Sequence, residues 1–222
     1  MQSKEKIKHI TNRQGVQLAQ KARENGVSRS DFKKFLDNPV KLKDFFMELN
    51  EDNKWFEKLQ ANAQEIGARV HLIPKLIVDY AKSHNELAMA GGPQTGSGYN
   101  VLKVGDKYPS IGNKVVEEVI ILFNWPKDGG SYQKAVEWGL SNGLQKTVPK
   151  EAFTIGQQFP KLNYELGPNP MYVAETTGCS FGGDPDTCDT CFVWWSDAKR
   201  ESNLYWQGDF GSDDVWFAFR KK

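Results

Sequence analysis

The spacing of hydrophobic residues changes along the chain and divides it into two parts. Through roughly the first third, apolar residues recur at the spacing of one helix face, as at Phe32 and Phe35. Pro39 and Pro74 interrupt this pattern, which indicates several short helices rather than one long helix. We therefore expect a helical N-terminal region over residues 1–87.

Residues 88–98, AMAGGPQTGSG, are rich in Gly, Ser and Pro and carry almost no apolar side chain. This composition is typical of a flexible linker. We place the domain boundary here, and expect a C-terminal domain over residues 99–222.

The pattern changes beyond the linker. The run VVEEVIILF at residues 115–123 is short and rich in β-branched residues, which predicts a buried strand. A helix should follow it, because Ser131 is a suitable N-cap, an apolar stripe follows, and Gly143 provides a stop.

A second helix should begin near Thr147, a candidate cap, with Pro149 near its first position, and end at Gly167. Phe153 and Phe159 are expected on its buried side. A strand, two helices and then more strands make an α+β fold. The later strands are predicted at four short runs, MYVAETT, CFVWW, SNLYWQ and VWFAFR.

Tryptophans are concentrated near the end of the chain. Four of the seven lie within residues 191–222, interleaved with Ser and Asp residues typical of turns. They are Trp194, Trp195, Trp206 and Trp216.

Three features of this part resemble a known family. A helix ends in NGL, Thr147, Pro149 and Glu151 open the next helix, and the Trp-rich run closes on WFAFR. Together they resemble the C-type lectin fold in the variable proteins of diversity-generating retroelements, especially those of archaea, their viruses and small-genome candidate bacteria. The resemblance covers roughly Tyr99 to Lys222.

The resemblance implies a receptor whose ligand-binding face is rewritten. An error-prone reverse transcriptase would alter the 3′ end of the gene at template adenines. Randomised AAC or AAT codons reach Asn, Asp, Ser, Gly, Tyr, Phe and Cys but never Trp, so the tryptophans would remain as framework. The expected ligand-binding positions are Gly183, Asp184, Asp186, Asp189, Phe192, Ser196, Asp197, Ser202, Tyr205, Gly208, Asp209, Ser212, Asp213 and Asp214.

Strand alternation separates framework from display in the run NLYW. Leu204 and Trp206 are expected to face the core, and Asn203 and Tyr205 the ligand. The same region is acidic and should prefer a basic or hydrogen-bond-donating partner, a protein or other macromolecule. Without the resemblance, these short polar residues are equally typical of loops chosen for turn chemistry.

The three cysteines, Cys179, Cys188 and Cys191, form a C-x8-C-x2-C pattern. They supply three of the four soft ligands of a structural zinc site, and the three histidines all lie in the N-terminal part. Free thiols, a disulfide and a zinc site stay open, in that order of preference. We expect no metal and no cofactor.

Residues 17–36 fit the spacing of a helix-turn-helix at Ala22, Gly26, Phe32 and Phe35. A DNA-binding regulator with a C-terminal sensor domain is therefore the alternative function. The other interpretation is a small helical region for oligomerisation or attachment to a larger assembly such as a virion. The basic side chains that would reach phosphates are Arg29, Lys33 and Lys34.

We expect no enzyme activity, because no histidine follows His84 and the C-terminal part contains no Ser/His/Asp set. The tripeptides associated with calcium-dependent sugar binding are also absent from the sequence. No apolar run reaches the length of a membrane span, and the first residues lack the apolar core of a signal peptide. An intracellular or virion-associated protein with no membrane partner is expected.

Overall fold

The computed structural model describes residues 28, 33, 54–127, 130–181, 188–209 and 213–222. The chain forms two compact units, Met1–Trp55 and Phe56–Lys222. Apart from isolated positions, the predicted helix-turn-helix lies outside the described residues. The fold described here is that of the second unit.

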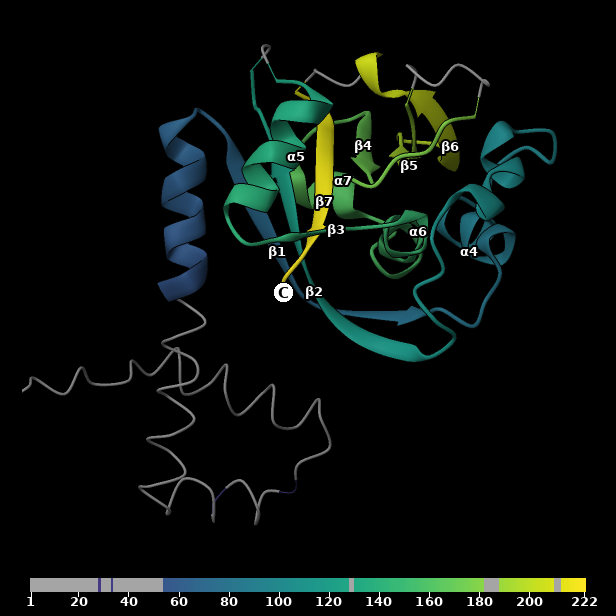
Figure 1. The fold of residues 1–222 in the computed structure, drawn as a ribbon, viewed down its shortest axis with the longest axis horizontal. Helices are drawn as coiled ribbons and strands as arrows, with labels where there is room; N and C mark the ends of the chain where they lie inside the picture. Colours follow the sequence, from purple (N-terminus) through teal and green to yellow (C-terminus); the bar gives the residue numbers. More distant parts are fainter. Residues whose placement is uncertain (1–27, 29–32, 34–53, 128–129, 182–187, 210–212) are drawn as a thin grey trace, which may run out of the picture. The chain divides into compact units, whose positions relative to one another are not determined.

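A seven-stranded sheet forms the centre of this unit (Figure 1). All its pairings are antiparallel except that of β4 with β7. The strand order is β1 (Arg69–Asp79), β2 (Val115–Asn124), β7 (Val215–Arg220), β4 (Met171–Ala174), β5 (Asp189–Trp195) and β6 (Arg200–Trp206), with β3 (Gln145–Lys146) pairing with β7.

Short helices connect the strands and cover the sheet. A helix at residues 54–65 precedes β1. The others are α4 (His84–Gly91), α5 (Tyr132–Ser141), α6 (Pro149–Gln158) and α7 (Leu162–Leu166), with 3-10 turns η1 (Asn100–Lys103), η2 (Gly105–Lys107) and η3 (Gln207–Asp209). The predicted α+β class is confirmed, as are the strands expected at 115–123 and in the four C-terminal runs.

The sequence signals for α5 work as expected. The Ser131 hydroxyl accepts a hydrogen bond from the Lys134 N–H at 3.2 Å, so it caps the first turn. Gly143, just past the end, has φ +75°, a conformation that favours glycine.

The second helix starts one residue later than expected, with Pro149 at its first position. Its cap is Val148, whose N–H donates to the Glu151 carboxylate at 2.6 Å. The Thr147 hydroxyl instead donates to the carbonyl of Ala218 at 2.7 Å, and so ties the helix start to β7. The single helix predicted as far as Gly167 is two helices, because α6 ends at Gln158 and α7 follows.

One face of the sheet, here called the core face, packs against α4 and α6. Strand alternation brings Leu122, Val173, Val193 and Trp216 to this face, and all four are buried. The helices contribute Leu87, Phe153 and Ile155 to the same hydrophobic cluster. This cluster is the main core of the unit.

The opposite face is covered by α5 over β2 and β7. Phe123 stacks on Trp138 with ring centroids 4.2 Å apart, and Phe217 meets Tyr132 at 5.9 Å. A Cβ at Gly139 would lie 2.3 Å from the Phe219 ring, so only glycine allows α5 to approach so closely. Over β4, β5 and β6 none of the described helices makes comparable contacts with this face.

The helical prediction for residues 1–87 is wrong at β1. Arg69–Asp79 is an edge strand paired with β2, and its register shifts between Ile73 and Leu76. Pro74 lies within that irregularity, where a missing N–H costs no ladder hydrogen bond. An edge strand therefore tolerates the proline that suggested a helix boundary.

The linker prediction for residues 88–98 is also wrong. Ala88 and Thr95 are buried, and Gly91 ends α4. A Cβ at Gly91 would lie 2.5 Å from the carbonyl oxygen of Phe153, and one at Gly92 would lie 2.0 Å from the Ser202 nitrogen. These glycines permit close packing, and the unit boundary lies near residue 55 instead.

The outer edge of β6 is closed by side chains. The backbone N–H groups of Arg200, Ser202 and Leu204 donate to side-chain oxygens of Gln94, Thr95 and Asn203, at 2.8–2.9 Å. Gln94 and Thr95, which follow α4, thus extend the hydrogen bonding of the sheet by one row beyond β6.

Within the described part of the chain, none of the helices has both the length and the apolar character needed to cross a membrane.

Candidate ligand-binding face

Four aromatic side chains gather on the half of the sheet that α5 does not cover. Tyr172 of β4, Phe192 and Trp194 of β5 and Tyr205 of β6 project on the side opposite the core face. The reason is alternation: Val193 and Trp195 point into the core, so their neighbours on β5 point away from it. We call these four residues the aromatic face.

The rings of the aromatic face contact one another across three strands. Tyr172 meets Trp194 at 6.5 Å and Phe192 at 5.4 Å, and Phe192 stacks on Tyr205 at 5.6 Å with an angle of 3° between the planes. Tyr205 is 53% exposed, Tyr172 and Trp194 are partly exposed, and Phe192 is covered by its neighbours. The result is a strip of packed rings with its outermost ring in solvent.

Three carboxylates of the described residues lie next to the strands that carry the strip. Asp213 is exposed and Asp214 partly exposed at the start of β7, and the Tyr172 N–H donates to the Asp214 carbonyl at 2.9 Å. Asp197, exposed beyond β5, accepts hydrogen bonds from Asn169 and Tyr164. The strip is therefore bordered by acids at two of its sides.

The nearby cations are directed elsewhere. The Arg200 guanidinium donates to the carbonyl of Gly91 at 2.6 Å, on the core side of the sheet. Lys199 pairs with Glu201 at 3.7 Å.

Burial raises the pKa of the Tyr172 phenol, and the neighbouring Asp214 and Tyr205 raise it further, so this hydroxyl stays protonated at neutral pH.

The expected ligand-binding residues divide into three groups. Tyr205, Gly208, Asp197 and Asp213 are exposed, and Asp189, Ser196 and Asp214 are partly exposed. Gly183, Asp184, Asp186 and Ser212 lie outside the described residues, as does the side chain of Asp209. Phe192 and Ser202 are buried.

The assignment of Phe192 and Ser202 to an exposed display surface is wrong, for different reasons. Phe192 is on the expected side of the sheet but lies between Tyr172 and Tyr205. Ser202 points to the core face, where its hydroxyl donates to the Ala88 carbonyl at 2.7 Å. Its partner is the segment that the sequence suggested was a linker.

The expected strand register is correct, yet Trp206 is not a core residue. Leu204 is buried and Tyr205 exposed, as predicted, but Trp206 is 49% exposed. It projects toward the core side at the end of β6, beyond Leu204, the last residue of that strand in the hydrophobic cluster. Its ring lies over Gly208, where a Cβ would come within 2.4 Å of the ring carbons.

Sequence reasoning missed Tyr172 and Trp194 as residues of this surface, whereas the outward position of Asn203 was expected. The register pairs Tyr172 with Trp194, and Phe192 with Asn203. The available signal was the alternation of buried Val193 and Trp195 with Trp194 within β5. The prediction assigned all the tryptophans near the C-terminus to the framework, and so it overlooked the outward position of Trp194.

A buried carboxylate holds the loop that follows β4. Glu175 is fully buried, and burial raises its pKa although several groups donate to it. Through these hydrogen bonds, the Glu175 side chain links the end of β4 to β5 beneath the aromatic face. The donors are the hydroxyls of Tyr108 (2.9 Å) and Thr190 (2.7 Å) and the N–H groups of Cys191 (3.1 Å), Thr177 (2.6 Å) and Gly178 (2.9 Å).

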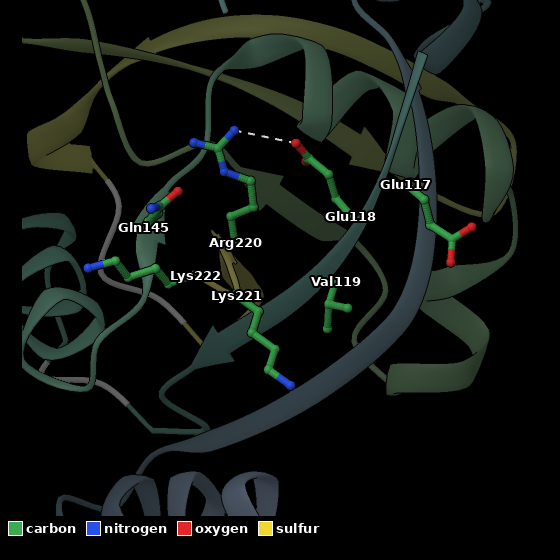
Figure 2. A pocket seen from close by; sticks show the side chains of 7 residues that line it. All are labelled: Glu117, Glu118, Val119, Gln145, Arg220, Lys221 and Lys222. Atoms are coloured by element: carbon green, nitrogen blue, oxygen red, sulfur yellow. Dashed lines mark hydrogen bonds and ion pairs between the residues drawn. The ribbon is translucent and has the colours of Figure 1, made fainter. Parts of the chain in front are cut away.

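A cavity of about 400 Å³ lies beside β2, β3 and β7, at the other end of the sheet. Figure 2 shows the side chains that line it. The Arg220 guanidinium points toward Glu118 at 3.4 Å and also pairs with buried Glu151 at 3.2 Å. Glu117 pairs with Lys75 at 2.8 Å. Because Arg220, Glu117 and Glu118 are each already paired, the cavity is a weaker candidate for a ligand site.

Two carboxyls beside this cavity, Glu118 and Glu151, lie close enough to influence each other's charge. Burial and the neighbouring Glu118 raise the pKa of Glu151 to about 8, and these effects outweigh the opposing influence of Arg220. Tyr80 donates its hydroxyl to Glu118 at 2.8 Å. Burial in this cluster therefore favours the protonated form of Glu151 more than exposure to water would.

A second cavity, of about 290 Å³, lies where α4, η2 and α6 meet. The imidazole Nε2 of His84 donates to the carbonyl of Val101 at 2.7 Å, and burial lowers the pKa of this histidine, so it is neutral at pH 7. Lys150 donates to the carbonyls of Tyr80 and Lys82. This cavity is not lined by residues of the aromatic face.

Cys179, Cys188 and Cys191 are unbridged thiols, and burial raises the pKa of each. Among the residues that the structure describes, no group of three or more His, Cys, Asp or Glu side chains is arranged to hold a metal ion.

None of the protein-family models, curated proteins or solved structures compared with this chain matches it.

Proposed function

We propose that this chain is a non-enzymatic binding protein that holds its ligand on the aromatic face. The observation that carries the proposal is the unequal covering of one side of the sheet. α5 buries the rings of β2 and β7, whereas Tyr205, Tyr172 and Trp194 keep part of their surface in solvent. Contiguous exposed aromatic groups are typical of interaction sites, where they contribute most of the binding energy.

We further propose that a retroelement diversifies this face through adenine-directed mutagenesis, and that the domain is of the C-type lectin type. The order after residue 114, with β2 followed by α5, the short β3, α6 and α7 and then the four strands β4 to β7, supports the fold. Tyr205, Asp213 and Asn203 support the diversification, since their residue types are reachable from AAC or AAT codons and their side chains are at least partly exposed.

The framework tryptophans then have two tasks. Trp195 and Trp216 are buried and stabilise the core. Trp194 is partly exposed, and its codon contains no adenine. It would be a constant aromatic contact beside positions that vary from one copy of the gene to another.

Capture experiments with the full chain test the binding role. The variant Tyr205→Ala/Asp213→Ala should lose the partner that the unchanged chain retains, because exposed aromatic and charged side chains at the centre of an interface dominate its energy. Leu140→Ala is the matched control, since Leu140 on α5 is 50% exposed against 53% for Tyr205. Equal capture by both variants would contradict binding through this face.

Genome sequence tests the diversification separately. We expect a nearby reverse transcriptase gene and a repeat of the 3′ end that differs only where the template has adenine. A complete genome without such a repeat would remove the retroelement from the proposal and leave the binding role intact.

A further inference from the structure

We infer that the partner of the aromatic face is a cationic polypeptide segment whose arginine side chains stack on Tyr172 and Tyr205 beside Asp214. The inference rests on the proposed function, because it names the chemistry of the partner that occupies the same face.

The geometry of Tyr205 is the first argument. One side of its ring is packed in parallel against Phe192 at 5.6 Å, and its exposure of 53% places the other side in solvent. An open ring face attracts a cation through its quadrupole, and the planar guanidinium of arginine also stacks on it. Tyr172 offers a second, partly exposed ring at the neighbouring strand.

Charge is the second argument. The described carboxylates next to the aromatic face are Asp197, beyond β5, and Asp213 and Asp214, at the start of β7. The nearby cations Lys199 and Arg200 contact Glu201 and the Gly91 carbonyl instead. An anionic partner would be repelled from this surface, and a neutral glycan would gain nothing from the charges.

The chain already contains a comparable combination on β7, the neighbouring strand, on the opposite side of the sheet. The Arg69 guanidinium lies over the Trp216 ring, 4.7 Å from its centroid. The negative charge of Asp213 favours the charged form of Arg69, although burial lowers its pKa overall. A guanidinium, an aromatic ring and an aspartate therefore fit together at this end of the sheet.

The shape of the surface decides between a small cation and a polypeptide. Neither cavity described above is lined by the aromatic face, whose rings span β4, β5 and β6 as a strip. Small molecules bind mainly in concave pockets, whereas an extended chain can contact successive rings along a strip.

The first experiment selects phage-displayed random dodecapeptides on the full chain and, in parallel, on Tyr205→Ala. We expect the enriched peptides to be rich in arginine and to be lost on the variant. Peptides that depend on Tyr205 but are neutral or acidic would overturn the cationic inference and leave the proposed function standing. Absence of enrichment, or equal enrichment on both proteins, would overturn both.

The second experiment measures affinity for two synthetic probes, Gly-Arg repeated six times and its Gly-Gln counterpart. The arginine peptide should bind about tenfold more tightly, since the surrounding charge favours it. Tyr205→Leu should weaken its binding about two- to fivefold, the factor expected for one exposed cation–π contact, whereas Tyr205→Phe should retain it. Equal affinity of the Leu and Phe variants, or of the two peptides, would contradict the inference.

Control variants separate specific binding from general attraction of a basic peptide. Glu117→Gln removes an exposed charge on β2, and Leu140→Ala an exposed apolar side chain on α5. Neither should change the affinity, while Asp214→Asn should lower it. A loss of affinity with Glu117→Gln as large as that with Asp214→Asn would also contradict the inference.

Discussion

One side of the sheet has two halves, of which α5 covers one and leaves the other open. Over β2 and β7, Phe123, Phe217 and Phe219 are buried beneath α5. Over β4, β5 and β6, rings at equivalent alternate positions of the strands stay partly in solvent, as at Tyr172 and Tyr205. Aromatic content and alternation are therefore shared, and the presence of a covering helix separates a core from a binding surface.

The two halves therefore contribute differently, the covered half to the stability of the fold and the open half to recognition. The covered half and the core face remove large apolar side chains from water, each contributing about 1.5–3 kcal/mol or more. The open half contributes less to folding, so its outermost side chains can change with little loss of stability. A diversified receptor needs such a division.

The largest expected effect concerns the segments that border both halves. A fragment of residues 99–222 lacks β1, which pairs with β2, and α4, which packs on the core face beside β6. We expect it to lack cooperative thermal unfolding, whereas residues 56–222 should unfold cooperatively. A well-folded 99–222 fragment would show that the halves do not need these segments.

The next effect concerns the covered half. Phe123→Ala should lower the free energy of unfolding by about 3–5 kcal/mol, because it leaves a cavity between β2 and α5. Urea denaturation measures the change. A loss below about 1 kcal/mol, the typical value for an average substitution, would mean that α5 contributes little to the core.

The free energy of unfolding should also depend on pH, because the buried carboxyl of Glu151 lies beside Arg220 and Glu118 on the strands of the covered half. The pKa of Glu151 is about 8 in the folded chain against an ordinary 4.5, so the folded chain binds this proton more tightly. Its contribution to stability is therefore complete below pH 4.5 and declines as pH rises toward 8, by at most about 1.4 kcal/mol per pH unit.

Urea denaturation at several pH values checks this contribution. Glu151→Gln should flatten the decline, while Glu117→Gln, an exposed control on β2, should leave it unchanged. An unaltered slope in Glu151→Gln would show that the proton is held elsewhere in the cluster.

The smallest effect belongs to the open half. Tyr205→Ala should change the free energy of unfolding by no more than about 0.5 kcal/mol, as surface substitutions usually do. Trp206→Ala should cost about 1 kcal/mol or less rather than the amount expected of a core tryptophan, since the ring is half exposed over Gly208. Thermal denaturation decides: a loss comparable with that of Phe123→Ala would place either residue in the core.

Strong local patterns were sufficient to predict much of this fold. The β-branched run of β2, the Ser131 cap and the aromatic strands near the C-terminus each depend on neighbouring residues alone. β1 was missed because Pro74 signals an interruption unless the strand is known to lie at an edge. Edge position is a property of the assembled sheet and is not visible in the segment.

The candidate site was predictable only in part, for a related reason. Alternation correctly separated Leu204 from Tyr205, but it could not show where the core ends along β6, which decides the exposure of Trp206. The glycines of residues 88–98 were equally ambiguous. Flexibility and close packing both favour glycine, and only the Phe153 backbone next to Gly91 distinguishes them.

The closed edge of β6 has a consequence for how many sequences this face can tolerate. An unpaired strand edge is a template for aggregation, and each new side chain on it changes that risk. Gln94 and Thr95 occupy the N–H groups of Arg200 and Ser202, and both lie about a hundred positions before the strand that they protect. Gln94 and Thr95 therefore lie outside the segment that would vary under the proposed diversification, so every variant of the face would keep the same protection of this edge.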